Sequence, residues 1–365
     1  MTHVHNAWDW AQRNLFATRM DAIVTIGLSI VLLAIAMPVL DWAFLSAVWQ
    51  GQDGSACRSV SAGACWPFIY AKFNQFVFGR YPDAEQWRVL LVFVLGAASI
   101  GWLAWPKAPR KSQVGAFLLI VFPIVAAFLL TGGWFGLKAV ETNLWGGMLI
   151  TLVVAFVGIV ASLPLGILLA LGRRSELPII RLFCTGFIEF WRAVPLVIFL
   201  FMASNMLPLF FPAGVTIDKL MRALVAVALF SSAYMAEVVR GGLQAVPKGQ
   251  FEAALSLGMG YWRAMVFIVL PQALRHVLPG IVNTFIGLFK DTSLVYVIGL
   301  FDMLGVITVN LTDPTWFSAQ TAATGYVFVA FVFWIFCFAM SRYSVRLEAN
   351  LGQGRNEADR FMTMR

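Results

Sequence analysis

The sequence predicts an all-α integral membrane protein with about eight membrane-spanning helices. Three observations predict this class: apolar residues make up 60% of the 365 positions, charged residues make up only 12%, and long apolar runs recur along the chain. Soluble domains contain about 45–50% apolar and about 25% charged residues. A helix of about 20 apolar residues is long enough to cross the hydrocarbon core of a bilayer. A water-soluble globule is therefore excluded.

The first apolar run lies between Asp21 and Asp41. It is too long for the core of a signal peptide, and no small-residue cleavage site closes it, so we interpret it as a retained span. The net charge of +8 is better explained by cationic cytoplasmic loops than by nucleic-acid binding, because no RNA- or DNA-binding module is visible.

Eight apolar segments are expected to span the bilayer. They cover 22–45, 89–105, 114–131, 145–171, 188–211, 220–239, 278–300 and 322–341. With the N-terminus inside, most of the 26 Lys and Arg residues fall in inner segments, so both termini are expected in the cytoplasm. The fifth segment contains Pro195 and Pro208. Such breaks persist in a membrane only where protein or a water-filled cavity covers the freed backbone groups.

The chain is expected to divide into three parts. Residues 1–140 form an N-terminal extension with three spans and an outer loop, 141–347 form a five-span core, and 348–365 form a polar cytoplasmic tail. The outer loop contains Cys57 and Cys65, which are candidates for a disulfide in an oxidising compartment. Two free thiols are the alternative. Cys184 and Cys337 lie in apolar segments and are expected to be packing residues.

The segment between the sixth and seventh spans carries the strongest motif. Its defining positions are Glu252, Ala253, Ala254, Gly258, Ile268, Leu270 and Pro271. The pattern predicts a short helix, a glycine break and a second helix that ends before the proline. Phe251, Leu255 and Met259 recur at four-residue spacing as an apolar ridge, while the small residues permit close approach by another protein. Such a helix is suited to a groove on a partner.

This pattern of E-A-A, three residues, G, nine residues and I-x-L-P resembles the signature loop of type I ABC importer permeases. The stretches Ala233–Gly241 (A-Y-x-x-E-x-x-R-G) and Lys290–Leu294 (K-D-T-S-L) resemble the polar amino acid branch of that family. Residues 189–195 resemble its E-x-x-R-G-T-P turn, but Ala193 and Val194 depart from it. The resemblance covers about 141–347. The N-terminal extension resembles that of general L-amino acid permeases or of glutamate/glutamine/aspartate permeases.

The resemblance implies a permease subunit of an ATP-driven importer that moves polar or general L-amino acids by alternating access in the bacterial inner membrane. It implies two ATPase subunits docked at residues 252–258, a periplasmic amino-acid-binding protein, and a second, similar permease chain, which we expect to be a different one. ATP and Mg would be bound by the ATPase subunits. Consistent with this, the chain has no G-x-x-x-x-G-K-[ST] phosphate loop. We expect no cofactor, metal site or catalytic residue on this chain.

The residues Lys290, Asp291, Thr292 and Ser293 interrupt an apolar segment. Charged residues within a membrane are costly and usually face a cavity. A zwitterionic amino acid needs an anion for its ammonium and donors for its carboxylate. Asp291 is the candidate anion, and the hydroxyls or backbone N–H groups at a helix break are candidate donors. The alternative is that Lys290 and Asp291 pair with neighbouring helices and only hold the bundle together.

Two other charged pairs and one amide are candidates. Glu189 with Arg192, and Glu237 with Arg240, have the i,i+3 spacing that allows pairing on one helix face. They are expected to be helix-end ion pairs or parts of a gate. Asn205, before Pro208, is a candidate cavity residue. An ion-coupled secondary transporter remains as a competing function, but it leaves the loop motif unexplained. A non-transporting scaffold or sensor is the other, and it predicts no ligand-dependent stimulation of ATP hydrolysis.

Overall fold

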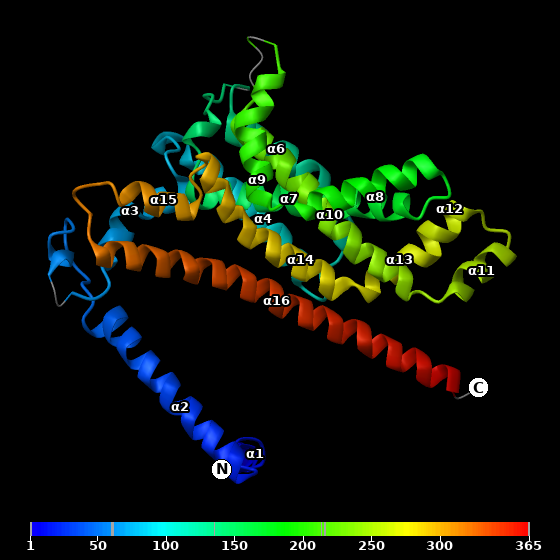
Figure 1. The fold of residues 1–365 in the computed structure, drawn as a ribbon, viewed down its shortest axis with the longest axis horizontal. Coiled ribbons are helices and arrows are strands. Elements are labelled where there is room, and N and C mark those ends of the chain that lie inside the picture. Colours follow the sequence, from blue (N-terminus) through cyan, green and yellow to red (C-terminus); the bar gives the residue numbers. More distant parts are fainter. Residues whose placement is uncertain (1, 60–61, 135, 213, 215–216, 364–365) are drawn as a thin grey trace. The chain divides into compact units, whose positions relative to one another are not determined.

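The computed structural model describes the backbone of residues 2–363 apart from 60–61, 135, 213 and 215–216, and the side chains of the described residues between 9 and 349. All regular elements in the described part of the chain are helices, joined by loops with isolated β-bridges (Figure 1). Contacts divide the chain into two compact units. The first comprises residues up to 72 together with 310–328, and the second comprises 73–309 together with 329 onward.

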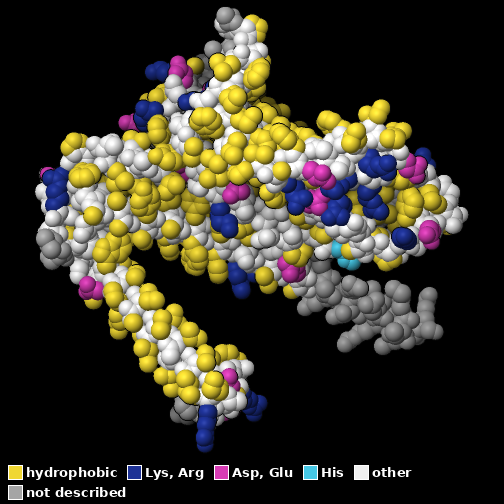
Figure 2. All heavy atoms as spheres, viewed as in Figure 1, with side chains coloured by type: hydrophobic (Ala, Val, Ile, Leu, Met, Phe, Trp, Pro, Cys, Tyr) yellow, Lys and Arg dark blue, Asp and Glu magenta, His cyan; other side chains and the backbone are white. Residues whose placement is uncertain are grey.

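The first unit begins with α1 (Thr2–Leu15) and α2 (Arg19–Leu40). Thr18 and Asp21 form a capping box at the start of α2: the Asp21 N–H donates to Thr18 Oγ1 (3.1 Å), and the Thr18 N–H donates to Asp21 Oδ2 (3.0 Å). No residue of α2 is buried within the chain, and its surface is hydrophobic along its length (Figure 2). This surface suits lipid, because a helix satisfies its backbone groups internally.

The loop that contains Cys57 and Cys65 is attached to the segment that precedes α16. Cys57 and Cys65 form a disulfide. Arg58 donates to the carbonyl oxygens of Pro314 (2.6 Å) and Phe317 (3.3 Å). Lys72 pairs with Asp313 at 3.0 Å, and this hydrogen bond lowers the pKa of the Asp313 carboxyl. The sequence did not predict this attachment.

The second unit holds most of the helices. They are α4 (Gln86–Ala104), α5 (Lys111–Ala116), α6 (Phe122–Thr131), α7 (Gly147–Arg173), α8 (Pro178–Ala193), α9 (Leu196–Phe201), α10 (Lys219–Ala245), α11 (Lys248–Ser256), α12 (Tyr261–Ala264), α13 (Leu270–His276), α14 (Leu278–Asp291) and α15 (Met303–Asn310, whose last residue belongs to the first unit). Helices α3 (Trp66–Phe78) and α16 (Ala319–Thr363) run from one unit into the other.

Seven helices of the described chain are long and apolar enough to span a membrane, and a bent pair makes up to eight. The bent pair, Pro178–Ala193 with Leu196–Phe210, turns by 99°. The predicted break at Pro195 is therefore confirmed, but the predicted limits of the fifth span, 188–211, are wrong. Its first half begins at Pro178 because proline at the first helical position needs no N–H partner.

Helix boundaries differ from prediction elsewhere too. Helices α3 and α15 were not predicted, because both are short and lie in segments interpreted as loops. Helix α14 ends at Asp291, and a 3₁₀ segment, η9 (Thr292–Ile298), follows it within the predicted seventh span. Helix α16 continues to Thr363, through the predicted tail 348–365. The side chains of that tail from residue 350 lie outside the described residues.

Three prolines are accommodated by π-helical turns. The π segments η4 (Phe117–Val121), η6 (Met202–Met206) and η8 (Met265–Val269) each end two residues before a proline, namely Pro123, Pro208 and Pro271. Proline lacks an N–H and its ring clashes with the carbonyl four residues earlier. The wider turn makes room for that ring while the helix continues.

Helices α7 and α10 form the centre of the second unit and pack closely on each other. Gly166 of α7 lies against α10: a Cβ there would be 2.7 Å from the Met235 Cβ and 3.0 Å from the Ala236 nitrogen. Small residues let backbones approach in membrane proteins, where dispersion contacts rather than water exclusion hold helices together. This packing fixes the C-terminal end of α7 beside α10.

We expect Gly166→Ala to destabilise the protein by about 1–3 kcal/mol, the usual cost of overpacking a tight core. Gly186→Ala is the matched control, because Gly186 is also helical but its Cβ would meet nothing within 4 Å. The control should be neutral or slightly stabilising. Thermal unfolding midpoints of the purified variants in detergent decide the matter. Equal midpoints for the two variants would contradict the close packing.

Asp302 is a buried carboxyl that lies between η9 and α15, outside the membrane-spanning segments. Its Oδ1 accepts from the Gly305 N–H at 2.9 Å, and its Oδ2 has no hydrogen-bond partner among the described residues. Burial raises its pKa to about 7, while bonds from backbone N–H groups oppose the shift. The folded protein therefore favours the neutral acid below about pH 7.

Because the folded pKa lies above the unfolded value, the folded state binds more protons between about pH 4 and 7. Stability from this group is present at low pH and is lost as the pH rises through about 7. We expect Asp302→Asn to flatten this part of the curve of thermal midpoint against pH. An unchanged curve in the variant would show that Asp302 does not titrate in this range.

Candidate functional site

The predicted loop motif forms a helix, a turn and a second helix at the end of α10. Helix α11 contains Glu252, Ala253 and Ala254. Gly258 ends the turn of α11 with φ of +80°, in the left-handed region that favours glycine. The N–H of Met259 donates to the Ala254 oxygen (3.2 Å), which closes the helix end. The glycine break that the sequence predicted is therefore confirmed.

The exposed surface of this loop is an apolar tip. Leu257 is 84% exposed, and Leu255 is exposed too. Ala254 faces inward, whereas Ala253 and Gly258 are exposed. The predicted ridge is partly wrong: Phe251 and Met259 are half-buried, and Phe251 packs against the Tyr261 ring at 5.7 Å between centroids. The prediction failed because the loop folds back on itself.

The sequence predicted that the second helix ends before Pro271, and this prediction is wrong. It runs from α12 through the π segment η8 into α13, with Pro271 at the second position of α13. Ile268 and Leu270 are half-buried and Pro271 is exposed. Leu270 packs on a hydrophobic core that also contains Met235 and Ala236 of α10. The motif's last residues thus join the loop to the helix bundle.

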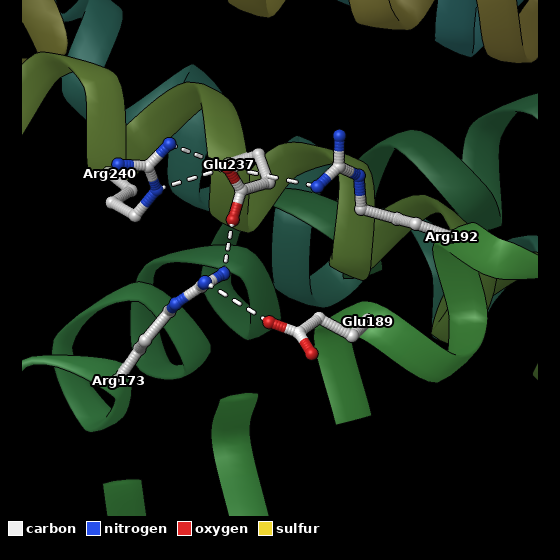
Figure 3. A network of polar contacts seen from close by, with 5 residues as sticks. All are labelled: Arg173, Glu189, Arg192, Glu237 and Arg240. Atoms are coloured by element: carbon white, nitrogen blue, oxygen red, sulfur yellow. Dashed lines mark hydrogen bonds and ion pairs between the residues drawn. The ribbon is translucent and has the colours of Figure 1, made fainter. Parts of the chain in front are cut away.

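A network of charged side chains joins α7, α8 and α10 (Figure 3). At its centre is the Glu237 carboxylate of α10, whose side chain is only 16% exposed. Its Oε1 accepts from Arg173 Nη1 at 2.6 Å, and its Oε2 accepts from Arg240 Nη2 at 2.8 Å. Arg192 lies 3.7 Å from the same Oε2, with its guanidinium 5.5 Å from the centre of the Tyr234 ring.

The pairing differs from prediction in one respect. Glu237 pairs with Arg240, as their spacing suggested. Glu189 and Arg192 do not pair with each other: Glu189 contacts Arg173 at 3.3 Å, and Arg192 contacts Glu237. The i,i+3 spacing permits a pair, but a less exposed carboxylate on the neighbouring helix attracts Arg192 more strongly, because water screens it less. Arg173 was missed. Its position at the end of a predicted span was the one feature of the sequence that could have indicated an ion pair with a neighbouring helix.

The network holds three guanidinium groups against two carboxylates, so it carries one excess positive charge. Charge-assisted hydrogen bonds to a partly buried carboxylate are among the stronger polar contacts. In Figure 2, Lys, Arg, Asp and Glu side chains gather on the visible face of the second unit towards α8 and α11. Three helices are therefore held together by one carboxylate near the loop motif.

We expect Glu237→Gln to cost about 1.5–3 kcal/mol, because charged hydrogen bonds are lost and three arginines remain without this counter-charge. Glu189→Gln is the matched control, since its carboxylate is 63% exposed and makes one longer contact. It should cost about 0–1 kcal/mol. Thermal midpoints in detergent measure both effects. A larger loss for Glu189→Gln would show that Glu237 is not the centre of the network.

The segment from Lys290 to Ser293 lies where α14 gives way to η9. Lys290 is exposed and Asp291 half-buried, and no ion pair within the described part of the chain includes either. The Thr292 hydroxyl donates to the Phe289 oxygen (2.7 Å), and the Ser293 hydroxyl donates to the Lys290 oxygen (2.9 Å). Both hydroxyls thus donate to backbone oxygens of the helix end in this structure, and a role as ligand donors stays a prediction.

Asn205 is the other polar candidate. It lies in the π segment η6, is exposed, and donates from Nδ2 to the Phe201 oxygen at 3.1 Å. No group of three or more His, Cys, Asp or Glu residues suited to a metal ion occurs in the searched, described residues; the side chains of His3 and His5 lie outside them.

Residues 162–352 match the family model described as the inner membrane component of binding-protein-dependent transport systems. This match covers more than half of the chain and contains the charge network, the loop motif and the Lys290–Ser293 segment. The chain belongs to this family. As a family member it is a permease subunit with several membrane-spanning helices.

Individual relatives extend the match beyond the permease core. The chain is 51% identical over 346 residues to the inner membrane amino-acid ABC transporter permease protein YhdY of Escherichia coli (strain K12), covering 95% of this chain and 93% of the relative. It is 36% identical over 409 residues to the glutamate/glutamine/aspartate/asparagine transport system permease protein BztC of Rhodobacter capsulatus, covering 94% and 93%. These alignments include the N-terminal extension.

Among solved structures, an amino acid ABC transporter crystallised with histidines is similar to this permease. The identity is 31%, the match covers 55% of this chain and 90% of the other, and the TM-score is 0.47.

Proposed function

We propose that this permease is the translocation subunit of an ATP-driven importer of polar or general L-amino acids. The observation that carries the proposal is the exposed α11 tip, which is built on the Gly258 turn and attached to the helix that carries Glu237. The two relatives that match nearly the whole chain are named as amino-acid permeases, which supports the substrate class.

In this proposal the α11 tip docks into a groove of an ATPase subunit on the cytoplasmic side. Two ATPase subunits, which bind ATP and Mg, a second similar permease chain and a periplasmic amino-acid-binding protein complete the transporter. Leu255 and Leu257 supply apolar contact, and the exposed Ala253 and Gly258 allow the partner's backbone to come close. This orientation places both chain termini in the cytoplasm.

The charge network gives α11 a route to the substrate path. Only Val246 and Pro247 separate α10 from α11, so a displacement of α11 moves the end of α10. That end carries Glu237 and Arg240, while the partners Arg173 and Arg192 belong to α7 and α8. ATP binding can shift the transporter from one conformation to another only if the ATP-bound ATPase subunits interact more favourably with one conformation than with the other. In this proposal, Glu237 contacts different arginines in the two conformations, and this change contributes to the difference in free energy between them.

The end of α14 is the proposed contact for the substrate's ammonium group. Asp291 offers a half-buried carboxylate there, and the last carbonyls of α14 add partial negative charge. Lys290 is the neighbouring cation for the substrate carboxylate. The hydroxyls of Thr292 and Ser293 act as acceptors rather than donors, because their protons are bound to backbone oxygens.

We expect Gly258→Ala to reduce amino acid uptake and substrate-stimulated ATP hydrolysis by about 5- to 30-fold, because a residue with a Cβ in the left-handed region costs about 1–2 kcal/mol. Gly249→Ala is the matched control. Neither Cβ would meet an atom within 4 Å, but only Gly258 has a positive φ. Asparagine tolerates that region better than alanine, so Gly258→Asn should keep more activity.

The assay uses the complex purified through a tag on this chain and reconstituted in vesicles with its binding protein. Uptake of single labelled L-amino acids and ATP hydrolysis are measured for each variant. If no ATPase subunit co-purifies and Gly258→Ala leaves uptake unchanged, the proposed coupling role is wrong.

A further inference from the structure

Helix α1 has one apolar face and one polar face. Its apolar residues fall on one side of the helical backbone, and they are Val4, Ala7, Trp8, Ala11 and Leu15. Its polar residues recur at spacings of three and four positions on the opposite side, and they include Thr2, Asn6, Asp9 and Arg13. This division follows from 3.6 residues per turn. A helix of this kind suits a boundary between an apolar medium and water.

The end of α1 exposes aromatic side chains. Trp10, which lies beside the apolar face, is 60% exposed, and Phe16, directly after the helix, is 47% exposed. Tryptophan is enriched where a bilayer meets water, because its ring is apolar and its N–H is polar. A helix of 14 residues is only marginally stable in water by itself. Helix α1 therefore needs a surface that covers its apolar side.

A hydrogen bond places the end of α1 beside the first turns of α2. The Thr25 hydroxyl donates to the Leu15 oxygen at 2.8 Å, and α2 begins at Arg19. Because each helical residue advances about 1.5 Å, the end of α1 lies about 9 Å along α2. The segment Arg19–Leu45 is long and apolar enough to span a membrane, and no residue of α2 is buried within the chain. The end of α1 thus lies level with the start of a lipid-facing span.

The connection between the two helices is held in a fixed turn. The capping box of Thr18 and Asp21 ends the connection, and the Ala22 N–H donates to the Thr18 oxygen at 3.0 Å. In Figure 1, α2 lies lengthwise and α1 coils at its end in another direction. The Arg13 and Arg19 side chains are exposed at this end, where Figure 2 shows Lys or Arg side chains. The guanidinium group matches the geometry of a phosphate.

We propose that α1 lies along the membrane surface as an in-plane lipid anchor. The face of Ala11 and Leu15 turns towards the acyl chains, the face of Asp9 and Arg13 turns towards water, and the guanidinium groups contact headgroup phosphates. Lipid is favoured over a groove on a partner protein, because α1 is bonded to a lipid-facing span at the level where that span begins. The anchor holds the start of α2 at a fixed depth. This inference requires α2 to span the bilayer, and it is independent of the transported substrate.

The test measures how deeply α1 lies in the bilayer, by electron paramagnetic resonance of spin labels on the whole complex in lipid nanodiscs. Cys184→Ser and Cys337→Ser give a background without these free thiols, while Cys57 and Cys65 stay in their disulfide. Each label is tested for collision with oxygen, which concentrates in lipid, and with a water-soluble nickel chelate. Thermal midpoints and co-purification of the other subunits verify that each labelled variant is folded.

We expect labels at Ala11→Cys and Leu15→Cys to lie about 5–10 Å below the boundary between headgroups and water. Labels at Asp9→Cys and Arg13→Cys, on the opposite face, should collide mainly with the nickel chelate. If all four labels collide mainly with the chelate, α1 lies in water and the proposal is overturned. If the labels of the apolar face collide with neither reagent, a protein surface covers that face, and the proposal is overturned as well.

Two reference labels calibrate the measurement. Ile30→Cys, on the exposed surface of α2, gives the value for lipid, and Glu176→Cys, exposed between α7 and α8, gives the value for water.

A matched pair of charge variants tests the face directly. Ala11→Glu puts a carboxylate on the apolar face, and Asn6→Glu puts the same group on the polar face. We expect Ala11→Glu to move a label at Leu15→Cys towards water, because a charged group is costly in the bilayer, and Asn6→Glu to leave its depth unchanged. Equal depths in the two variants would contradict the proposal. Neither result changes what the Gly258→Ala uptake experiment shows.

Discussion

The carboxylate of Glu237 holds the end of the second unit together, because arginines from three helices converge on it. Arg173 ends α7, Arg192 lies near the end of α8, and Arg240 follows one turn later on α10. Gly166 of α7 lies against Met235 of α10, and this close packing brings the Arg173 side chain of α7 within reach of Glu237. The α11 tip continues directly from this end of α10. Loop motif and charge network are thus parts of one structure.

Irregular helices position the rest of the site. Helical structure continues through the π turns before Pro123, Pro208 and Pro271, while Pro38 and Pro164 lie inside the regular helices α2 and α7. The chain instead changes direction at Pro195, between α8 and α9, where no π turn precedes the proline and the backbone of Val194 is extended. Residues before proline disfavour the helical conformation. The chain thus turns by 99° at Pro195, whereas helical structure continues past Pro123, Pro208 and Pro271.

Much of the fold and part of the site could be predicted from the sequence. Apolar length predicted the spans, and the glycine in the loop motif predicted the Gly258 turn, because both signals are local. Partner choice in the charge network could not be predicted: Glu189 and Arg192 have the spacing of a pair, but neighbouring helices offer other partners. The hydroxyl orientations of Thr292 and Ser293 depend on where α14 ends, and an apolar run does not fix that point.

The attachment of the loop that contains Cys57 and Cys65 has a consequence for how the chain can change over generations. Arg58 contacts the main-chain oxygens of Pro314 and Phe317, and the Gly54 N–H donates to the Thr315 oxygen at 2.9 Å. These hydrogen bonds depend on the backbone position of the segment and not on its side chains. The exposed side chains of Pro314 and Phe317 are therefore free to vary as long as the backbone keeps its course, whereas the buried Trp316 packs against Phe68. Substitutions at Pro314 and Phe317 can therefore change the surface of this segment while its backbone stays bonded to the loop that contains Arg58.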